Sequence, residues 1–414
     1  MSDRAQLFRP WLQAMTARDP AEPHRGATPL ELLFDLCFVV AVAQVAAQLH
    51  HAVSENHAAT GVLSYLAVFF AIWWAWMGFT WFASAYDVDD VPYRLSTFVQ
   101  IAGVLVLASG VPRAFTQHDF VLPVVGYTVM RLSLLSQWLR AARAHPEGRA
   151  TAMRYVVGIV VIQSAWIGWL FMPVGSRMPL FALLALFDLA VPIWAESAAR
   201  TAWHPHHIAE RYGLFTLIVL GESVLAATTA VQHAVGAGEA TGDLYTVAAG
   251  GLLIVLSLWW LYFAKPAERF LNSSRAAFVW GYGHYLLFGS AAAIGAGLAV
   301  NVDHATHHTQ ISGAAAGASV TIPVAVFLLV VYLLHIRPQH AFALHALLVP
   351  GTAVVVLALT FTSVPVLATS LAVAALVVAS VAIAERREPR RPPAPARRAG
   401  GLLRGRARGV GDRR

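Results

Sequence analysis

Long apolar runs alternate with short polar segments along almost the whole chain. Each run approaches the roughly 20 residues that an α-helix needs to cross a bilayer. We predict twelve spans, at residues 30–48, 61–82, 96–111, 121–139, 155–172, 179–196, 212–232, 245–264, 277–300, 320–335, 341–359 and 364–384. Only a few residues around Ser363 separate the last two spans, so eleven helices are an alternative. The pattern predicts an all-α polytopic membrane protein.

Composition excludes the ordinary soluble classes. Hydrophobic residues make up 58% of the chain and charged residues only 12%, which is unlike a soluble domain. The single cysteine, Cys37, excludes a disulfide within the chain and a cysteine-based metal site. Residues 1–27 are basic but lack an apolar core, so they are not a cleavable signal peptide and the first span must direct insertion.

The basic residues lie almost entirely on one side of the predicted spans. Of the 29 Lys and Arg, 26 lie in the leader, in every second loop after it and in the tail. Because cytoplasmic loops are enriched in these residues, we predict that both termini are cytoplasmic. Three segments follow: a cytoplasmic leader at 1–27, a transmembrane domain at 28–384 and a disordered Arg/Pro-rich cytoplasmic tail at 385–414. The basic tail favours anionic lipid headgroups.

The order of motifs predicts an internal repeat. Three features recur at an offset near 180 residues: Glu31 with Glu210, Trp73-Trp74 with Trp259-Trp260, and Phe98-Val99 with Phe278-Val279. We therefore divide the membrane domain into halves at about 28–200 and 205–384. Because each half holds an even number of helices, both copies would run in the same direction through the membrane.

Two segments resemble a known family. Residues 28–39 (TPLELLFDLCFV) and 206–223 (HHIAERYGLFTLIVLGES) are similar to the bacterial low temperature requirement A family. The similarity covers about residues 25 to 385. It implies a multi-pass protein of the bacterial cytoplasmic (inner) membrane, in a family named for a growth phenotype in the cold. The resemblance implies no biochemical activity.

Three charged residues fall near the middle of predicted spans: Arg131, Asp188 and Glu222. A charge at the bilayer centre costs roughly 2.5 to 3.5 kcal/mol, so such residues face a partner or a water-filled path. Their common depth predicts a cluster in which one acid is protonated or free to hold a cation. The alternative is a structural ion cluster that fixes helix packing. Gly213 and Gly221, on the helix of Glu222, favour close contact with another helix.

A second group of acids opens the first span. Glu31 and Asp35 lie one helical turn apart on one face. Two neighbouring acids without a paired cation suit proton pickup or cation entry, whereas the alternative is simple stabilisation of the helix N-terminus. His284 lies at a similar depth in the ninth span, and we assign it to a proton relay toward Asp35.

The start of the seventh span carries a polar cluster of its own. His206, His207 and Glu210 have the spacing of a one-turn metal site, but two His and one carboxylate are too few to specify one. The favoured interpretation is a hydrogen-bonded cluster of His207, Glu210 and Arg211 that fixes the start of the helix. We expect neither a metal nor a cofactor.

Three function classes remain, because no nucleotide-binding loop or catalytic motif is present. The favoured class is a proton-coupled secondary transporter or ion-conducting protein, with Glu222 as coupling group and Asp35 on the cytoplasmic route. The alternatives are an intramembrane enzyme acting on a lipid or lipid-linked substrate, and a structural or sensory protein linked to growth at low temperature. Expected partners are the bilayer and a small solute or cation. We expect no nucleic acid, and a homodimer is left open.

Overall fold

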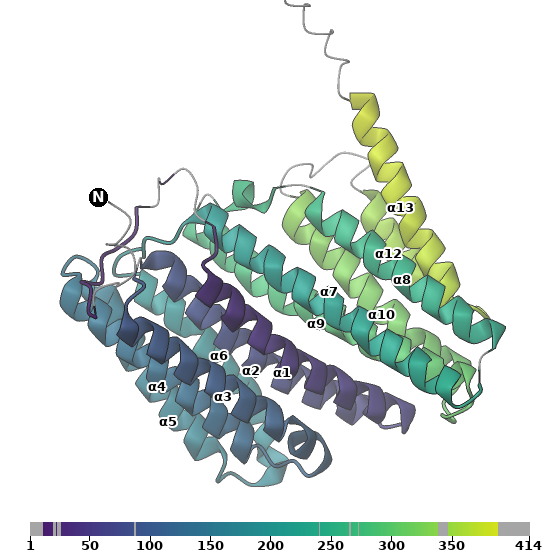
Figure 1. Ribbon diagram of the computed structural model, residues 1–414, viewed down its shortest axis with the longest axis horizontal. Helices are drawn as coiled ribbons and strands as arrows, with labels where there is room; N and C mark the ends of the chain where they lie inside the picture. The colour runs from purple at the N-terminus through teal and green to yellow at the C-terminus, as the bar shows by residue number, and fades with distance from the viewer. Residues whose placement is uncertain are drawn as a thin grey trace, which may run out of the picture.

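The computed structural model describes residues 11–19, 22, 26–86, 88–239, 241–264, 266–271, 273–337 and 347–387. This part of the chain forms twelve α-helices and no β-strand, which confirms the predicted all-α class (Figure 1). The helices are α1 (Pro29–Ser54), α2 (Ala58–Ala85), α3 (Val91–Thr116), α4 (Val121–Ala144), α5 (Arg149–Trp169), α6 (Val174–Glu196), α7 (Pro205–Gly236), α8 (Gly242–Phe263), α9 (Ser274–Ala305), α10 (Gly313–Val331), α12 (Leu348–Leu359) and α13 (Pro365–Arg387).

Ten helices of the described residues are long and apolar enough to cross a membrane. The two α-helices outside this set are α4, which carries Arg131, and α12, which has 12 residues. Residues 341–346 of the predicted eleventh span lie outside the described part. A turn at residues 360–364 separates α12 from α13, so this region forms two helices rather than one. The chain is therefore built as a multi-pass membrane protein.

The helices form two groups, with α1 to α6 on one side and α7 to α13 on the other (Figure 1). We call the end of the bundle where α1, α3, α5, α7 and α9 begin the near end, and the opposite end the far end. In the first group α1 packs on α2 and α3, α3 on α4, α4 on α5, and α5 on α6. In the second group the same order of neighbours joins α7, α8, α9, α10, α12 and α13. This correspondence supports the predicted repeat, which stays a prediction.

One neighbour relation differs between the groups. α13 packs along α8, where the backbone of Leu367 lies within 3.3 Å of the position a Cβ would take at Gly250. The corresponding helices of the first group, α6 and α2, touch at Phe181 and Phe70, whose ring centroids are 6.0 Å apart, and both of these residues line a cavity. In the first group a cavity therefore lies beside α2 and α6, whereas in the second group α8 and α13 pack directly against each other.

The helices that carry the two family-like segments begin in the same way. Thr28 caps α1 and exchanges hydrogen bonds with Glu31 in a capping box, with Pro29 in the first helical position. His204 caps α7, and Pro205 follows it. Side chains thus satisfy amide groups that a helix start leaves unpaired, which fixes where each helix begins.

Aromatic side chains fill the space where α1, α2, α7 and α9 meet. At most 1% of each is exposed, and they include Phe34, Phe38, Trp76, Phe79, Phe215 and Phe288. The ring of Trp76 lies 4.4 Å from that of Phe215, so this core joins the two groups. Burial of such rings supplies large contact areas, each with a preferred geometry.

The leader covers part of the near end. Met15 is buried, and the amide of Gln13 donates to the Asp90 carboxylate at 3.0 Å. The carbonyl of Glu22 lies 2.7 Å from Nε2 of His204, the residue that caps α7. The described part of the leader is therefore packed against the helices rather than free of them.

Small residues let α3 and α4 approach closely. A Cβ added at Gly126 would lie within 2.5 Å of the Leu107 nitrogen and against the Gly103 carbonyl oxygen. Backbone atoms cannot move aside as a flexible side chain can, so the contact requires glycine. Helix pairs in membranes often depend on such close approach.

We predict that Gly126→Ala destabilises the protein by about 1–3 kcal/mol, because the methyl group forces α3 and α4 apart. Unfolding of the purified protein in detergent, followed by circular dichroism, measures the change. Gly221→Ala is the matched control, since nothing lies within 4 Å of its added Cβ. Equal stability of the two variants would contradict the proposed contact.

Candidate functional site

A buried group of charges joins α1 to α7. We call it the sealed cluster: Glu31, Asp35, Trp76, His207 and Arg211. The guanidinium of Arg211 donates to both oxygens of Asp35, with Nε 2.8 Å from Oδ2. Trp76 Nε1 donates to the same carboxylate at 2.7 Å. Glu31 Oε1 lies 3.2 Å from His207 Nε2 and 3.5 Å from Arg211 Nη1. None of the four ionisable residues is more than 1% exposed.

The sealed cluster arises from two matching helix faces. Glu31 and Asp35 are four residues apart on α1, and His207 and Arg211 are four residues apart on α7, so each pair lies on one face. The expectation that the two acids lack a paired cation is wrong, because Arg211 forms ion pairs with both of them. Neither described cavity is lined by these residues. The cation beside these acids is therefore the Arg211 side chain of the protein itself.

Glu210 does not join this group. Its carboxylate accepts a hydrogen bond from the Ala27 amide at 2.9 Å and so anchors the leader to α7. The predicted local cluster of His207, Glu210 and Arg211 is therefore wrong about Glu210, while His206 lies half-buried on the same turn. Within the described residues, no three His, Cys, Asp or Glu side chains gather as a metal site would require.

A second ion pair lies inside the first group of helices. Arg131 Nη2 on α4 donates to Asp188 Oδ1 on α6 at 2.6 Å and to the Tyr127 hydroxyl at 2.6 Å. Trp166 Nε1 on α5 donates to the other oxygen of Asp188 at 3.0 Å. Asp188 is fully buried and Arg131 is 8% exposed. We call these four residues the barrier layer. The predicted contact between Arg131 and Asp188 is confirmed.

Glu222 is separate from that pair. It lies on α7, is 8% exposed, and has no hydrogen bond or ion pair with another described residue. The predicted three-charge cluster is therefore a pair plus one solitary acid. Of the two glycines expected in close contacts, Gly213 lies against Phe263, whereas Gly221 faces open space.

His284 is buried among aromatic rings. Its Nδ1 lies 2.7 Å from the Trp280 carbonyl, so Nδ1 carries the proton in the neutral ring. Nε2 then accepts from the Tyr262 hydroxyl at 3.1 Å. On another side the ring of Tyr212 lies 4.9 Å from that of His284. Among the described residues no hydrogen bond leads from His284 to Asp35, so the relay stays a prediction.

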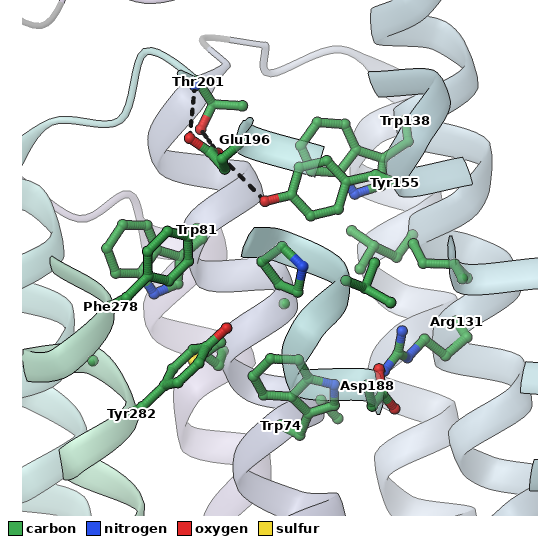
Figure 2. A pocket seen from close by; sticks show the side chains of 18 of the residues that line it. Trp74, Trp81, Arg131, Trp138, Tyr155, Asp188, Glu196, Thr201, Phe278 and Tyr282 are labelled. Carbon is green, nitrogen blue, oxygen red and sulfur yellow. Dashed lines mark hydrogen bonds and ion pairs between the residues drawn. The ribbon is translucent and has the colours of Figure 1, made fainter. Parts of the chain in front are cut away.

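The larger described cavity extends from the near end to the barrier layer (Figure 2). We call it the near cavity, and its empty space of about 950 Å³ includes the part that is open to solvent. Residues of α2 to α6 and α9 line it, together with the loop between α6 and α7. Its charged and polar lining includes Gln100, Arg131, Asp188, Glu196, Thr201 and Ser274.

Glu196 is a lining residue that sequence reasoning missed. Its Oε1 accepts from the Thr201 hydroxyl at 2.6 Å and from the Tyr155 hydroxyl at 3.3 Å, and its Oε2 accepts from the Thr201 amide at 3.1 Å. These contacts are drawn in Figure 2. An acid at the end of an apolar span resembles an ordinary interfacial residue, so its position alone gave no signal. The structure places it on the cavity wall.

A second cavity lies on the opposite side of the barrier layer. This far cavity holds about 520 Å³ of empty space, and aliphatic and aromatic residues of α2 to α6 line it. Tyr127 lines both cavities. Trp166, the indole donor to Asp188, lines the far cavity. The ion pair therefore lies between two cavities.

Residue spacing along α6 gives the order of these parts. Glu196, at the near end, lies eight residues from Asp188, or about 12 Å along the helix. Phe181, which lines the far cavity, lies about 10 Å beyond Asp188 in the other direction. Near cavity, barrier layer and far cavity thus follow one another along the helix axes.

Comparison with known proteins identifies the family. The model of the bacterial low temperature requirement A protein (LtrA) matches residues 26–383, which contain both cavities and both ion pairs. The chain belongs to the LtrA family. It is 30% identical over 277 residues to an uncharacterized protein of Rhizobium meliloti (strain 1021), which covers 63% of this chain and 65% of that relative. No solved structure matches the chain.

For this LtrA chain we predict that Arg211→Met destabilises the protein by about 3–5 kcal/mol, because it leaves the carboxylates of the sealed cluster buried without their cation. Adding Asp35→Asn to the variant should recover part of the loss. Chemical unfolding in mixed micelles measures both effects.

Arg211→Lys is the control for this prediction. It keeps the charge but loses the two parallel hydrogen bonds of the guanidinium, so we expect an intermediate stability. Wild-type stability of Arg211→Met would show that the pair does not hold α1 and α7 together.

Proposed function

We propose that this protein is a secondary transporter that moves a small solute or cation through the two cavities on either side of Arg131 and Asp188. The observation that carries the proposal is the position of Arg131 and Asp188 between two cavities that share Tyr127 as a lining residue. Charged residues within membrane helices line transport paths when they border cavities. In this proposal each cavity receives the solute from one side of the membrane.

The barrier layer has the properties of a gate. To join the two cavities, the ion pair between Arg131 and Asp188 must separate, and Tyr127 must move. Separation inside the membrane is costly unless another group takes the place of the lost partner. A proton or a cationic solute on Asp188 is such a replacement, which couples opening of the gate to binding.

α6 is the element we expect to move. Pro192, four residues after Asp188, has no amide hydrogen, so the Asp188 carbonyl lacks its usual helical partner. One residue further along α6, the Leu189 carbonyl accepts from the Tyr282 hydroxyl of α9 at 2.8 Å. The buried residues of α6 are only Asp188, Val191 and Ala195. A helix with a weakened point and little burial is suited to bending at the gate.

Among the buried acids, Asp188 is best placed to exchange a proton. It lines the near cavity and is itself part of the gate, through its ion pair with Arg131. Asp35 is held by Arg211 away from the described cavities, and Glu222 lines neither of them. We therefore assign proton coupling to Asp188 in place of Glu222. From the distribution of basic residues, we place the near end on the cytoplasmic side of the bacterial inner membrane.

The other function classes have less support. An enzyme acting on a lipid needs reactive groups beside an open site, but Glu31, Asp35 and His207 are buried away from the described cavities. A purely structural role for the mid-span charges would require two things: each charge has a partner, and no cavity lies beside it. Asp188 borders a cavity, and Glu222 has no partner among the described residues.

We predict a solute-dependent proton movement in proteoliposomes that contain a trapped pH-sensitive dye. Monovalent cations and small organic solutes are added under an imposed proton gradient. The double variant Arg131→Met with Asp188→Asn keeps the barrier neutral but removes the coupling acid, so it should abolish the signal. Glu222→Gln should keep it. Absence of a signal for every solute with the wild type, or loss only in Glu222→Gln, would contradict the proposal.

A second prediction tests the gate by chemical access. Ala75 lines the near cavity and Ala71, one turn away on α2, lines the far cavity. In a Cys37→Ser background, Ala75→Cys should react with a membrane-impermeant thiol reagent only from the near-end side. Ala71→Cys should react only from the far-end side. Reaction of either cysteine from both sides in inside-out and right-side-out vesicles would show that no barrier separates the cavities.

A further inference from the structure

We infer that the near cavity binds an organic cation with an apolar body, and that Glu196 supplies the opposite charge. The inference rests on the proposed function only in taking this cavity as the solute site. It names the class of solute, which neither the family nor the gate specifies.

Charge is the first argument. The ionisable acidic and basic side chains that line the near cavity are Arg131, Asp188 and Glu196. The first two form an ion pair at 2.6 Å, which leaves Glu196 as the acid of the lining that no ion pair neutralises. The hydrogen-bond donors to Glu196 are the neutral groups of Thr201 and Tyr155. No basic group of the described residues forms an ion pair with it.

The nearest basic side chain along the chain, Arg200, acts electrostatically on Glu196 but forms no ion pair with it. The guanidinium of Arg200 lies 4.2 Å from the centre of the Trp203 ring, and the residue is exposed. Glu196 thus has hydrogen bonds that hold its carboxylate in place but lacks a cation within ion-pair distance in the described structure. A bound solute can supply that cation. An anion would meet the carboxylate and find Arg131 already occupied.

The aromatic lining is the second argument. Eight of the 24 lining residues are aromatic. Near Glu196 the rings of Trp138 and Tyr155 stack at 4.1 Å. Trp81 meets Trp203 edge to face at 5.1 Å, and the Arg200 guanidinium already lies over the Trp203 ring. Such rings attract cations through their electron-rich faces, and the attraction strengthens where water is excluded. They also bury apolar groups, which a hydrated inorganic ion does not offer.

The supply of oxygen ligands is the third argument. A bound metal ion such as Ca²⁺ or Mg²⁺ needs several of them. Within the described residues, Glu196 has no second unpaired carboxylate beside it on the wall. The lining therefore favours an organic cation over an inorganic one.

The test measures binding of tetraphenylphosphonium to the purified full-length protein in detergent by equilibrium dialysis, with protein-free micelles as the blank. Tetraphenylborate, an anion of matched size and shape, is the comparison. We expect the cation to bind at least tenfold more tightly than the anion. Glu196→Gln should weaken cation binding at least tenfold, because it removes the charge and keeps the shape.

Two variants separate loss of the site from loss of the fold. Glu196→Asp keeps the charge and should retain more binding than Glu196→Gln at equal thermal stability. Glu222 is a solitary acid outside the cavity, so the Glu222→Gln variant should bind the cation as tightly as the wild type does. Equal binding of the cation by Glu196→Gln and wild type, equal binding of anion and cation, or no binding of the cation would overturn the inference.

The binding measurement needs no membrane gradient, so its result can contradict the binding inference without contradicting the transport proposal. Saturable cation binding that depends on Glu196, without flux of any solute in proteoliposomes, would overturn transport and leave the binding site standing. Proton-coupled flux of another solute, without binding of the cation, would overturn the binding inference alone.

Discussion

The joining of the two helix groups depends on the ion pair between Asp35 and Arg211. Both side chains are fully buried, and each is tolerable inside the membrane only with the other beside it. The pair therefore fixes α1 and α7 in one register. Weaker links between the groups, such as the hydrogen bond from the Tyr65 hydroxyl to the Gly289 carbonyl, contribute about 1 kcal/mol each. They form only where that register is held.

The second buried pair differs from the first in its surroundings rather than in its bonds. Asp35 and Arg211 are covered by aromatic rings such as that of Phe79, which lies 5.7 Å from the guanidinium carbon. Arg131 and Asp188 border a cavity instead. Where no cavity adjoins a pair, nothing can replace a lost partner and the arrangement stays fixed. Where a cavity adjoins it, a proton or a solute can compete, so the same chemistry can serve a change of state.

The sequence predicted the spans and the depth of each charge, but depth alone does not say which helices face each other. Arg131 finds Asp188 because α4 and α6 both pack on α5, whereas Glu222 has a similar depth on a helix of the other group. The sealed cluster could have been predicted from the sequence, because His207 and Arg211 have the same four-residue spacing on α7 as the two acids have on α1. Glu196 gave no such signal, since its donors come from another helix and a loop.

Both described cavities are lined by helices of the first group, and the predicted repeat relates this to the charges on α4 and α6. Under that repeat α10 and α13 correspond to α4 and α6. Neither carries a charge in its middle: α10 has only Ser319 and Thr321 as polar residues, and the charges of α13 begin at Glu385. Without a buried pair to accommodate, α13 can pack directly along α8. The charged pair and the open space beside α2 therefore belong together.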